Sequence, residues 1–198
     1  SLILEIENFS VIPSIFFEKN KSEIYLDFLY KKDDLVFSNV IENLNIAIPF
    51  LASRDLFSKV NFLENFKLDV KSTIYSVISN FRFFLNENLQ EFDYQNFLFF
   101  TKNHLYFLIF YKNQLFFYKT YTIKSISVNL LIHKILQDMT KINLDRFYHN
   151  FFIFGSINED SIFYRKIKNY IKNINIFKKN KSIFDFSLFI KSYSDFFY

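Results

Sequence analysis

The sequence predicts a mixed α/β fold, in which strands and helices alternate along most of the chain. Residues 94–123 hold three strand-like apolar runs, which the pairs Lys102-Asn103 and Lys112-Asn113 separate about ten residues apart. An amphipathic helix follows them. Residues 151–154 then form a continuous apolar run, which is typical of a strand buried on both faces. The resulting order, β-β-β-α-β, is the most informative feature of the chain.

Composition limits the chemistry that the chain can perform. The chain has 198 residues, which is enough for one domain or two small ones with a substantial core. Phe occurs 31 times and Tyr 13 times, against one Gly, two Pro, no Trp and no Cys. We attribute this bias to an A/T-rich genome, so a Lys cluster or a Phe-rich strand carries less functional information here than elsewhere. The absence of Cys excludes disulfides, zinc thiolates and thiol catalysis.

Charge and hydropathy predict a soluble, cytoplasmic protein. The net charge of +4 would ordinarily suggest acidic partners, but much of the Lys excess is compositional. The first residues, SLILEIE, are acidic and lack the basic region of a signal peptide. Residues 97–118 are apolar but are interrupted by Lys102, His104 and Lys112, so they predict strands and turns rather than a membrane helix. Because the chain begins at Ser1 without Met, we expect it to be processed or cut from something longer.

The first half predicts the order β-α-β-β-α-α. Residues 1–13 are strand-like, and Pro13 ends this strand or places it at an edge. Residues 20–32 have helical spacing. Residues 35–41 and 46–52 are expected strands, with Pro49 at a bulge or an edge.

Two further helices are predicted in this half. Ser53 is expected to cap a helix over residues 54–67. Residues 71–86 are a stronger helix, because apolar residues recur at i, i+3, i+4, i+7 and i+11. These residues are Ile74, Val77, Ile78, Phe81 and Leu85. The polar and acidic residues 86–93 then mark the boundary between the two halves.

In the second half, the three apolar runs predict an antiparallel meander. Asn tolerates positive φ, so the two Lys-Asn pairs are acceptable tight turns. The helix that follows has one apolar stripe, formed by Val128, Leu131, Ile132, Ile135 and Met139. We expect Asn129, Lys134, Gln137 and Asp138 to lie off this stripe.

Beyond the strand at residues 151–154, we expect two more helices and one more strand. Asn158 is expected to cap the first helix, with Glu159 and Asp160 in its first turn, where they complement the helix dipole. Residues 174–177 are a strand. Residues 182–198 are a terminal helix or an aromatic tail packed on the sheet.

The second half therefore reads β-β-β-α-β-α-β-α, which predicts a mixed sheet flanked by helices. This is the chain order of the ribonuclease-H-like and actin-like ATPase fold. We expect residues 1–88 to form an incomplete first actin-like subdomain and residues 89–198 to form the second.

Several stretches also match a known family as patterns of turn and core residues. They are SVIPSIFF, KKDDLVFSNVIENLNIAIPF, the meander ending in QLFFYKTYTI, the strand-turn-helix FFIFGSINEDS, and IKNINIF. Through them, residues 10–177 resemble an uncharacterised bacterial domain of unknown function with an actin-like ATPase fold. The resemblance implies two related domains in tandem, each opening on a meander. Residues 1–13 resemble the fourth strand of the first domain, which implies an N-terminally truncated relative or a fragment.

The resemblance also indicates where a nucleotide would bind. Actin-like ATPases hold phosphates with glycine-rich hairpins, because a Cβ would block the backbone, and they position Mg²⁺ with strand-end carboxylates. Here that hairpin would fall at Thr101, Lys102 and Asn103, which offer neither Gly nor Asp. Gly155 and Ser156 stand where an adenosine loop would lie. These five residues are the candidate remnant turns of a nucleotide cleft, and ordinary turns are the simpler interpretation of them.

The histidines and the paired acidic residues of the sequence predict no catalytic or metal site. His104, His133 and His149 lack the spacing of metal ligands. Asp33-Asp34 and Glu159-Asp160 are more simply solvated turn residues. The meander strands contain no Asp or Glu, which argues against ribonuclease-H-type hydrolysis.

The basic tract at residues 165–181 is compatible with nucleic acid or anionic lipid. However, its Ile and Phe positions fit a helix and then a core strand, which leaves the Lys residues on the solvated side.

We therefore expect a non-catalytic, degenerate actin-like protein, a pseudoenzyme without cofactor, acting as a scaffold or adaptor. Its partner would be another protein, with a homodimer as one form, rather than nucleic acid or a membrane surface. One alternative is a nucleotide-binding actin-like ATPase completed by a missing N-terminal segment. A weaker alternative is a basic module that uses Lys178, Lys179 and Lys181.

Overall fold

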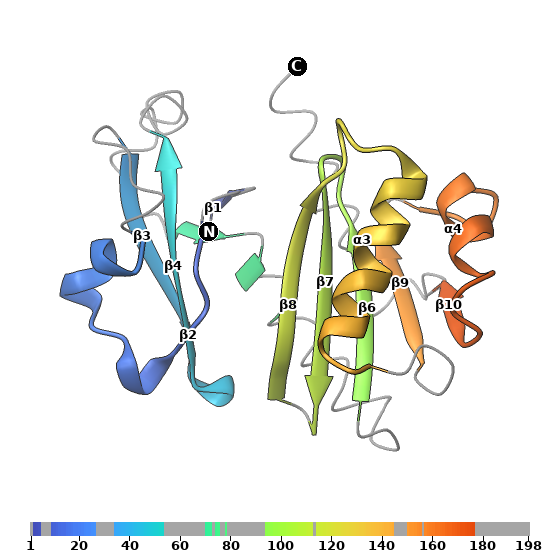
Figure 1. The fold of residues 1–198 in the computed structure, drawn as a ribbon. Helices are drawn as coiled ribbons and strands as arrows, with labels where there is room; N and C mark the ends of the chain where they lie inside the picture. Colours follow the sequence, from blue (N-terminus) through green and yellow to red (C-terminus); the bar gives the residue numbers. More distant parts are fainter. Residues whose placement is uncertain are drawn as a thin grey trace. The chain divides into compact units, whose positions relative to one another are not determined.

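The computed structural model of the chain describes residues 2–4, 9–26, 34–53, 70–72, 74–75, 78, 94–112, 114–144, 150–155 and 157–176. The chain divides into two compact units, Ser1–Phe83 and Phe84–Tyr198. Figure 1 shows both units. The predicted boundary between residues 88 and 89 lies outside the described residues.

The second unit is built on a five-stranded mixed sheet. Its strands are β6 (Tyr94–Phe100), β7 (His104–Tyr111), β8 (Gln114–Thr122), β9 (Phe151–Gly155) and β10 (Ile174–Ile176). Their spatial order is β10-β9-β6-β7-β8. β6, β7 and β8 form an antiparallel meander, and β9 and β10 run parallel to β6. The predicted meander and the strands after it are thus confirmed, as is the mixed sheet.

The described residues of this unit also form two helices, and each begins at a serine. The Ser127 hydroxyl accepts a hydrogen bond from the Leu130 N–H at the start of α3 (Val128–Lys141). The Ser161 hydroxyl accepts one from the Tyr164 N–H at the start of α4 (Ile162–Ile167). Such caps satisfy N–H groups that have no partner inside the helix.

The prediction that Asn158 caps α4 is wrong. The Asn158 carbonyl accepts a hydrogen bond from the Ser161 N–H at 3.2 Å, which closes a turn ahead of the helix. Glu159 and Asp160 therefore lie in that turn and not in the first turn of α4. Sequence reasoning chose the wrong capping residue because Asn158 and Ser161 are both good caps.

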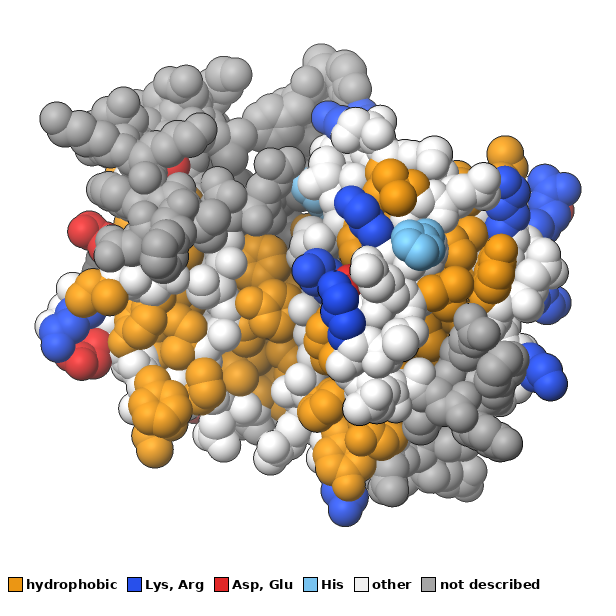
Figure 2. All heavy atoms as spheres, viewed as in Figure 1, with side chains coloured by type: hydrophobic (Ala, Val, Ile, Leu, Met, Phe, Trp, Pro, Cys, Tyr) orange, Lys and Arg blue, Asp and Glu red, His pale blue; other side chains and the backbone are white. Residues whose placement is uncertain are grey.

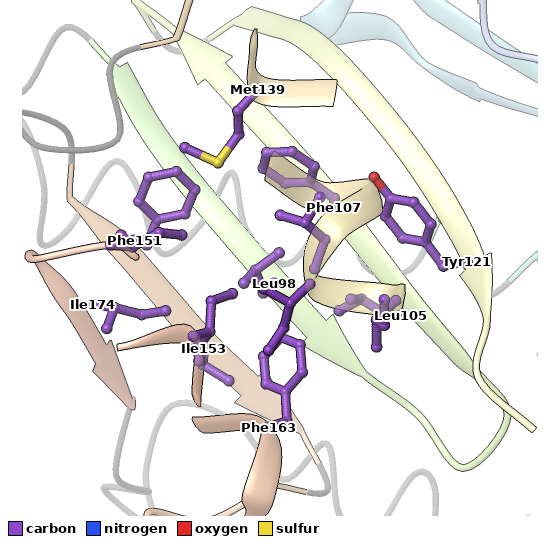
Figure 3. Packing of buried hydrophobic residues seen from close by; sticks show 14 of the residues in the cluster. Leu98, Leu105, Phe107, Tyr121, Met139, Phe151, Ile153, Phe163 and Ile174 are labelled. Atoms are coloured by element: carbon purple, nitrogen blue, oxygen red, sulfur yellow. The ribbon is translucent and has the colours of Figure 1, made fainter. Parts of the chain in front are cut away.

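The main core of the second unit lies between one face of the sheet and the two helices. α3 contributes Leu131, Ile132, Ile135 and Met139, as the predicted stripe required. α4 contributes Phe163 and Ile167. Figure 3 shows these helices above side chains of β6, β7 and β9, including Leu98, Phe107 and Ile153. Burial of an apolar side chain of this size contributes about 1.5–3 kcal/mol, so this layer is a major source of stability.

The other face of the sheet is buried too, and it is largely aromatic. Phe97 on β6 is at its centre, with its ring centroid 5.8 Å from those of Phe110 and Phe154 and 5.9 Å from that of Phe152. Phe97 and Phe110 are fully buried. Burial on both faces explains why these strands read as continuous apolar runs instead of alternating ones.

Asp138 corrects the predicted polar side of α3. It was expected off the apolar stripe, yet it is buried, and its Oδ2 accepts a hydrogen bond from the Tyr121 hydroxyl at 2.7 Å. Its other carboxylate oxygen lies 3.5 Å from the Lys141 Nζ. Asp138 follows Leu131 by two helical turns, so it shares that residue's face. The phenol and the ammonium group together offset the cost of burying the carboxylate.

The first unit contains a three-stranded antiparallel sheet and a separate parallel pair. The three strands have the order β2 (Ile12–Pro13), β4 (Ile46–Ser53), β3 (Asp34–Ile41). The parallel pair is β1 (Leu2–Leu4) and β5 (Val70–Ser72). The predicted strands at 35–41 and 46–52 are confirmed. Residues 1–13, expected as one strand, instead contribute to both sheets.

Three 3₁₀ segments connect these strands: η1 (Ser14–Phe16), η2 (Lys19–Leu26) and η3 (Glu42–Leu44). η2 covers the first part of the helix predicted over residues 20–32, and residues 27–32 lie outside the described part. Leu26, at the end of η2, is buried.

Pro13 is at an edge, as predicted, but Pro49 is not, since β4 is the central strand of its sheet. Phe9 bridges Phe50, and β2 pairs Ile12 with Ala47. The same register places Ser10 opposite Pro49, and the Ser10 N–H donates to the Pro49 carbonyl at 3.0 Å. The nitrogen of Pro49 faces the same side as that carbonyl, and it has no hydrogen to donate in return. The ladder is therefore interrupted between Phe9 and β2.

The helix predicted over residues 71–86 begins later than expected. Lys71 and Ser72 belong to β5, and Ile74, Tyr75 and Ile78 are helical. The Ser72 Oγ accepts a hydrogen bond from the Tyr75 N–H, while the Ser72 N–H donates to Asn39 Oδ1 at 3.0 Å. This buried serine therefore ends a strand and caps a helix.

The remaining predicted elements lie outside the described residues. These are the helix over residues 54–67, the boundary segment 86–93 and the terminal segment 182–198. Ser53, the expected cap of the first of these, is the last residue of β4. Within the described part of the chain, no helix is both long enough and apolar enough to cross a membrane.

We expect Tyr121→Phe to lower the free energy of unfolding by about 1–3 kcal/mol, because it leaves a buried carboxylate without its phenol donor. Burial, and then the hydrogen bond to Asp138, raise the pKa of Tyr121 well above its ordinary value of 10.0. A group with a raised folded-state pKa stabilises the fold fully below its unfolded pKa and loses this contribution as pH rises further. The stability gap between wild type and Tyr121→Phe should therefore narrow above about pH 10.

Denaturant unfolding followed by circular dichroism at several pH values measures this gap. Tyr170→Phe is the matched control, because Tyr170 is 46% exposed. The control should change stability by less than about 0.5 kcal/mol. A gap for Tyr121→Phe that stays constant from neutral to alkaline pH would contradict the assignment.

Candidate functional site

The predicted remnant turns of the nucleotide cleft come together at one edge of the sheet. Phe100, the last residue of β6, is the register partner of Gly155, the last residue of β9. The two strands are parallel, so the turn that follows Phe100 and the turn at Gly155 lie at the same end. In open α/β sheets, ligands bind outside the carboxyl ends of the strands. The structure therefore brings Thr101, Lys102 and Asn103 to the same end of the sheet as Gly155, while Ser156 lies outside the described residues.

The polar groups of the β6–β7 turn form hydrogen bonds mainly with one another. Thr101 is buried, and its Oγ1 accepts a hydrogen bond from the His104 N–H at 3.0 Å. The Thr101 N–H donates to the His104 carbonyl at 2.9 Å. Lys102 is exposed at the tip, and the Asn103 carbonyl accepts from the Ile123 N–H at 2.8 Å. The Thr101 hydroxyl and the backbone N–H groups of Thr101 and His104, which could otherwise bind a phosphate, are therefore already hydrogen-bonded within the protein.

The backbone of the two Lys-Asn turns departs from expectation. Positive φ was expected at Asn, yet Asn103 does not adopt it, whereas Lys112 has φ 48°. Asn113 lies outside the described residues. The four-residue turn closed by Thr101 and His104 needs no left-handed residue at Asn103, whereas the two-residue loop between Tyr111 and Gln114 favours positive φ.

Gly155 is required by a close approach of two backbones. Its φ is 93°, a conformation that residues with a side chain rarely adopt. A Cβ built there would lie 1.9 Å from the Phe100 carbonyl oxygen and 2.9 Å from the Phe100 carbonyl carbon. The glycine therefore allows the end of β9 to lie directly against the end of β6.

Aromatic side chains fill the layer beneath this edge. The ring of Phe100 packs edge-on against Phe163 of α4, with centroids 4.8 Å apart, and both residues are buried. On the loop after β9, the Ile157 N–H donates to the Gly155 carbonyl at 2.9 Å. This turn is closed by its own backbone, as at Thr101.

Acidic and imidazole side chains do not gather at this edge. Among the residues that the structure describes, no three His, Cys, Asp or Glu side chains form a group able to hold a metal ion. His104 is buried with its ring 6.2 Å from that of Tyr106, and His133 is exposed on α3. His149 and Asp33 lie outside the described residues. The buried carboxylate of the second unit, Asp138, is bound to Tyr121 instead.

The described part of the basic tract follows the predicted solvated pattern. Ile167, Ile171 and Ile174 are buried, while Arg165 and Lys166 are exposed. Lys178, Lys179 and Lys181 lie outside the described residues.

Comparison with known proteins supports the fold and the family. A family model described as "Protein of unknown function (DUF3822)" matches residues 1–174. A solved structure from Bacteroides thetaiotaomicron, described as a protein with actin-like ATPase fold and unknown function, superposes with a TM-score of 0.75 at 15% sequence identity. The match covers 88% of this chain and 66% of that chain, slightly under two thirds of its length. No curated protein matches. The predicted actin-like fold is confirmed.

We expect Gly155→Ala to destabilise the second unit by about 3 kcal/mol or more, because strain at positive φ adds to a clash with rigid backbone. Asn143→Ala is the matched control. Asn143 also has positive φ, at 55°, and it is exposed. Its replacement should cost only about 1–2 kcal/mol.

Thermal unfolding of both variants, followed by circular dichroism, provides the comparison. Equal and small losses of stability in the two variants would show that the approach of Gly155 to Phe100 is not a tight constraint.

Proposed function

We propose that this chain, which belongs to the family "Protein of unknown function (DUF3822)", is a non-catalytic member of the actin-like fold. In this proposal it acts as a scaffold or adaptor through contacts with other proteins. The sheet and helices supply a rigid body on which binding surfaces are held.

The contact of Gly155 with the Phe100 carbonyl carries this proposal. Nucleotide-handling folds of this type need a glycine-rich backbone that is open towards the phosphates. Here the one glycine of the chain is used to bring two strands together. Nearby, the Thr101 hydroxyl is bound to the backbone of His104.

The lack of carboxylates along the meander supports the same proposal. Phosphoryl transfer and ribonuclease-H-type hydrolysis both depend on acidic side chains that hold metal ions at strand ends. β6, β7 and β8 contain none. Glu159 and Asp160, which follow β9, are exposed turn residues.

A role in protein contact is supported by large apolar side chains at the surface. In the first unit, Ile15 and Phe16 of η1 are 84% and 68% exposed. In the second unit, Phe116 and Ile162 are each more than half exposed. Neighbouring exposed apolar side chains, such as Ile15 and Phe16, are common at protein interaction sites.

We expect isothermal titration of the purified chain with ATP or ADP, in the presence of Mg²⁺, to give no binding heat and no hydrolysis. The physical reason is that the candidate edge offers Lys102 as its one exposed cation and no metal ligand among the described residues. Circular dichroism confirms that the sample is folded.

Micromolar nucleotide binding with turnover would contradict the proposal and favour the nucleotide-binding alternative. In that case Lys102→Ala should abolish binding if the candidate edge is the site. Lys112→Ala, in the next hairpin turn, is the matched control and should leave it unchanged.

A further inference from the structure

The outward surface of α3 and α4 carries an excess of positive charge. From Val128 to Lys172, the cations of these helices and of the turn after α4 are Lys134, Lys141, Arg165, Lys166, Lys168 and Lys172, all of them exposed. The acidic residue of α3, Asp138, is buried against Tyr121, and α4 contains no acidic residue. The exposed carboxylates nearby are Glu159 and Asp160 in the turn before α4, so cations outnumber exposed carboxylates among these described residues.

Several of these cations contact neutral groups. The Arg165 guanidinium donates to the Asp160 backbone carbonyl, and Lys166 donates to Asn129 Oδ1. The Lys168 ammonium lies over the Tyr164 ring, 5.6 Å from its centroid. Lys141 lies 3.5 Å from Asp138 and forms an ion pair with it. Arg165, Lys166 and Lys168 therefore contact neutral oxygens or a ring rather than a carboxylate.

The two helices present one continuous surface. The 2.7 Å bond from the Lys166 Nζ to Asn129 Oδ1 joins exposed side chains of α4 and α3. Three large apolar side chains lie among the cations: Leu130 is 47% exposed, Ile162 59% and Tyr170 46%. Figure 2 shows Lys and Arg side chains interspersed with hydrophobic ones on this part of the second unit.

We infer that this α3–α4 surface, formed by the six cations and by Leu130, Ile162 and Tyr170, binds an acidic protein segment that also carries apolar side chains. Carboxylates of the segment pair with the cations, and its apolar residues cover the three exposed side chains. A few desolvated apolar anchors inside a charged rim is the arrangement that stable protein interfaces use. The inference rests on the proposed role in protein contact and names the partner's chemistry.

Other anionic partners fit this surface less well. Nucleic acid is bound by phosphate contacts and by stacking on aromatic rings, which would leave Leu130 and Ile162 unused. A membrane-surface helix needs a large apolar face of its own turned towards the lipid. The apolar face of α3 packs on the sheet, and α4 has only 6 residues.

Selection from a random peptide library displayed on phage, against the immobilised full chain, tests the inference. Enriched peptides should combine Asp or Glu with Leu, Ile or Phe, and their affinity should fall as salt is raised. Lys134→Glu and Lys168→Glu should each weaken such a peptide about tenfold or more, because a repulsive charge replaces an attractive one.

Matched variants in the first unit serve as controls. Lys19 is exposed, so Lys19→Glu makes the same charge change on an element of the first unit. Ile15 is 84% exposed, so Ile15→Asp matches Ile162→Asp. Peptide binding should survive both control variants and should be lost in Ile162→Asp.

Parallel measurements use vesicles containing phosphatidylserine and a single-stranded DNA oligonucleotide. The inference is overturned if enriched peptides lack acidic residues, or if they bind equally to Lys134→Glu and wild type. It is also overturned if no peptide is enriched. This holds even if vesicles or DNA bind through Lys134 and Lys168. Peptides that bind elsewhere on the chain would refute this surface and leave the proposed scaffold role standing, whereas nucleotide turnover would refute that role.

Discussion

The position of β9 in the second unit depends on one close contact, in which Gly155 lies against the carbonyl of Phe100. β6 is the middle strand of the sheet, with β7 on one side and β9 on the other. The end of β9 must therefore fit the end of β6 before the chain can turn towards α4. With any other residue, a Cβ would lie 1.9 Å from a backbone oxygen that cannot move aside without disturbing β6. The same contact uses the one glycine of the chain at the edge where this fold would accept a ligand.

Aromatic packing explains how a chain with one glycine and many phenylalanines still forms a two-layer α/β structure. On the helix face, Phe100 packs against Phe163, and on the other face Phe97 contacts three further rings. Ring pairs at these centroid distances contribute about 0.5–1.5 kcal/mol beyond the area that they bury. The aromatic residues that composition bias supplies thus fill both sides of β6. They also fill the layer beneath the candidate edge, where Phe100 packs against Phe163.

The sequence predicted the parts of the fold that depend on the spacing of hydrophobic residues and on the order of strands and helices along the chain. The meander, the stripe of α3 and the continuous apolar run of β9 follow from such patterns, and these identified the actin-like order. Two of the parts that failed depend on single polar contacts between residues distant in the sequence. Asp138 is buried because Tyr121 is its partner, and Ser72 belongs to β5, where its N–H donates to Asn39 Oδ1. For the candidate site, the sequence predicted that Thr101 and Gly155 lie at one edge, but it could not show how closely Gly155 approaches the Phe100 carbonyl.

Two regions of the second unit, the strand ends and the helical surface, differ in which partners their polar groups already contact within the protein. At the strand ends, the Thr101 and His104 groups bind each other, and the Gly155 carbonyl accepts from Ile157. A ligand there would have to replace internal hydrogen bonds. Each buried polar group that is left without a partner costs about 1–3 kcal/mol. On the helices, Arg165 and Lys166 contact neutral oxygens rather than carboxylates, so a partner with negative charge adds an attraction and breaks little. Binding at the helical surface is therefore less costly than binding at the strand ends, even though the fold itself would suggest the strand ends first.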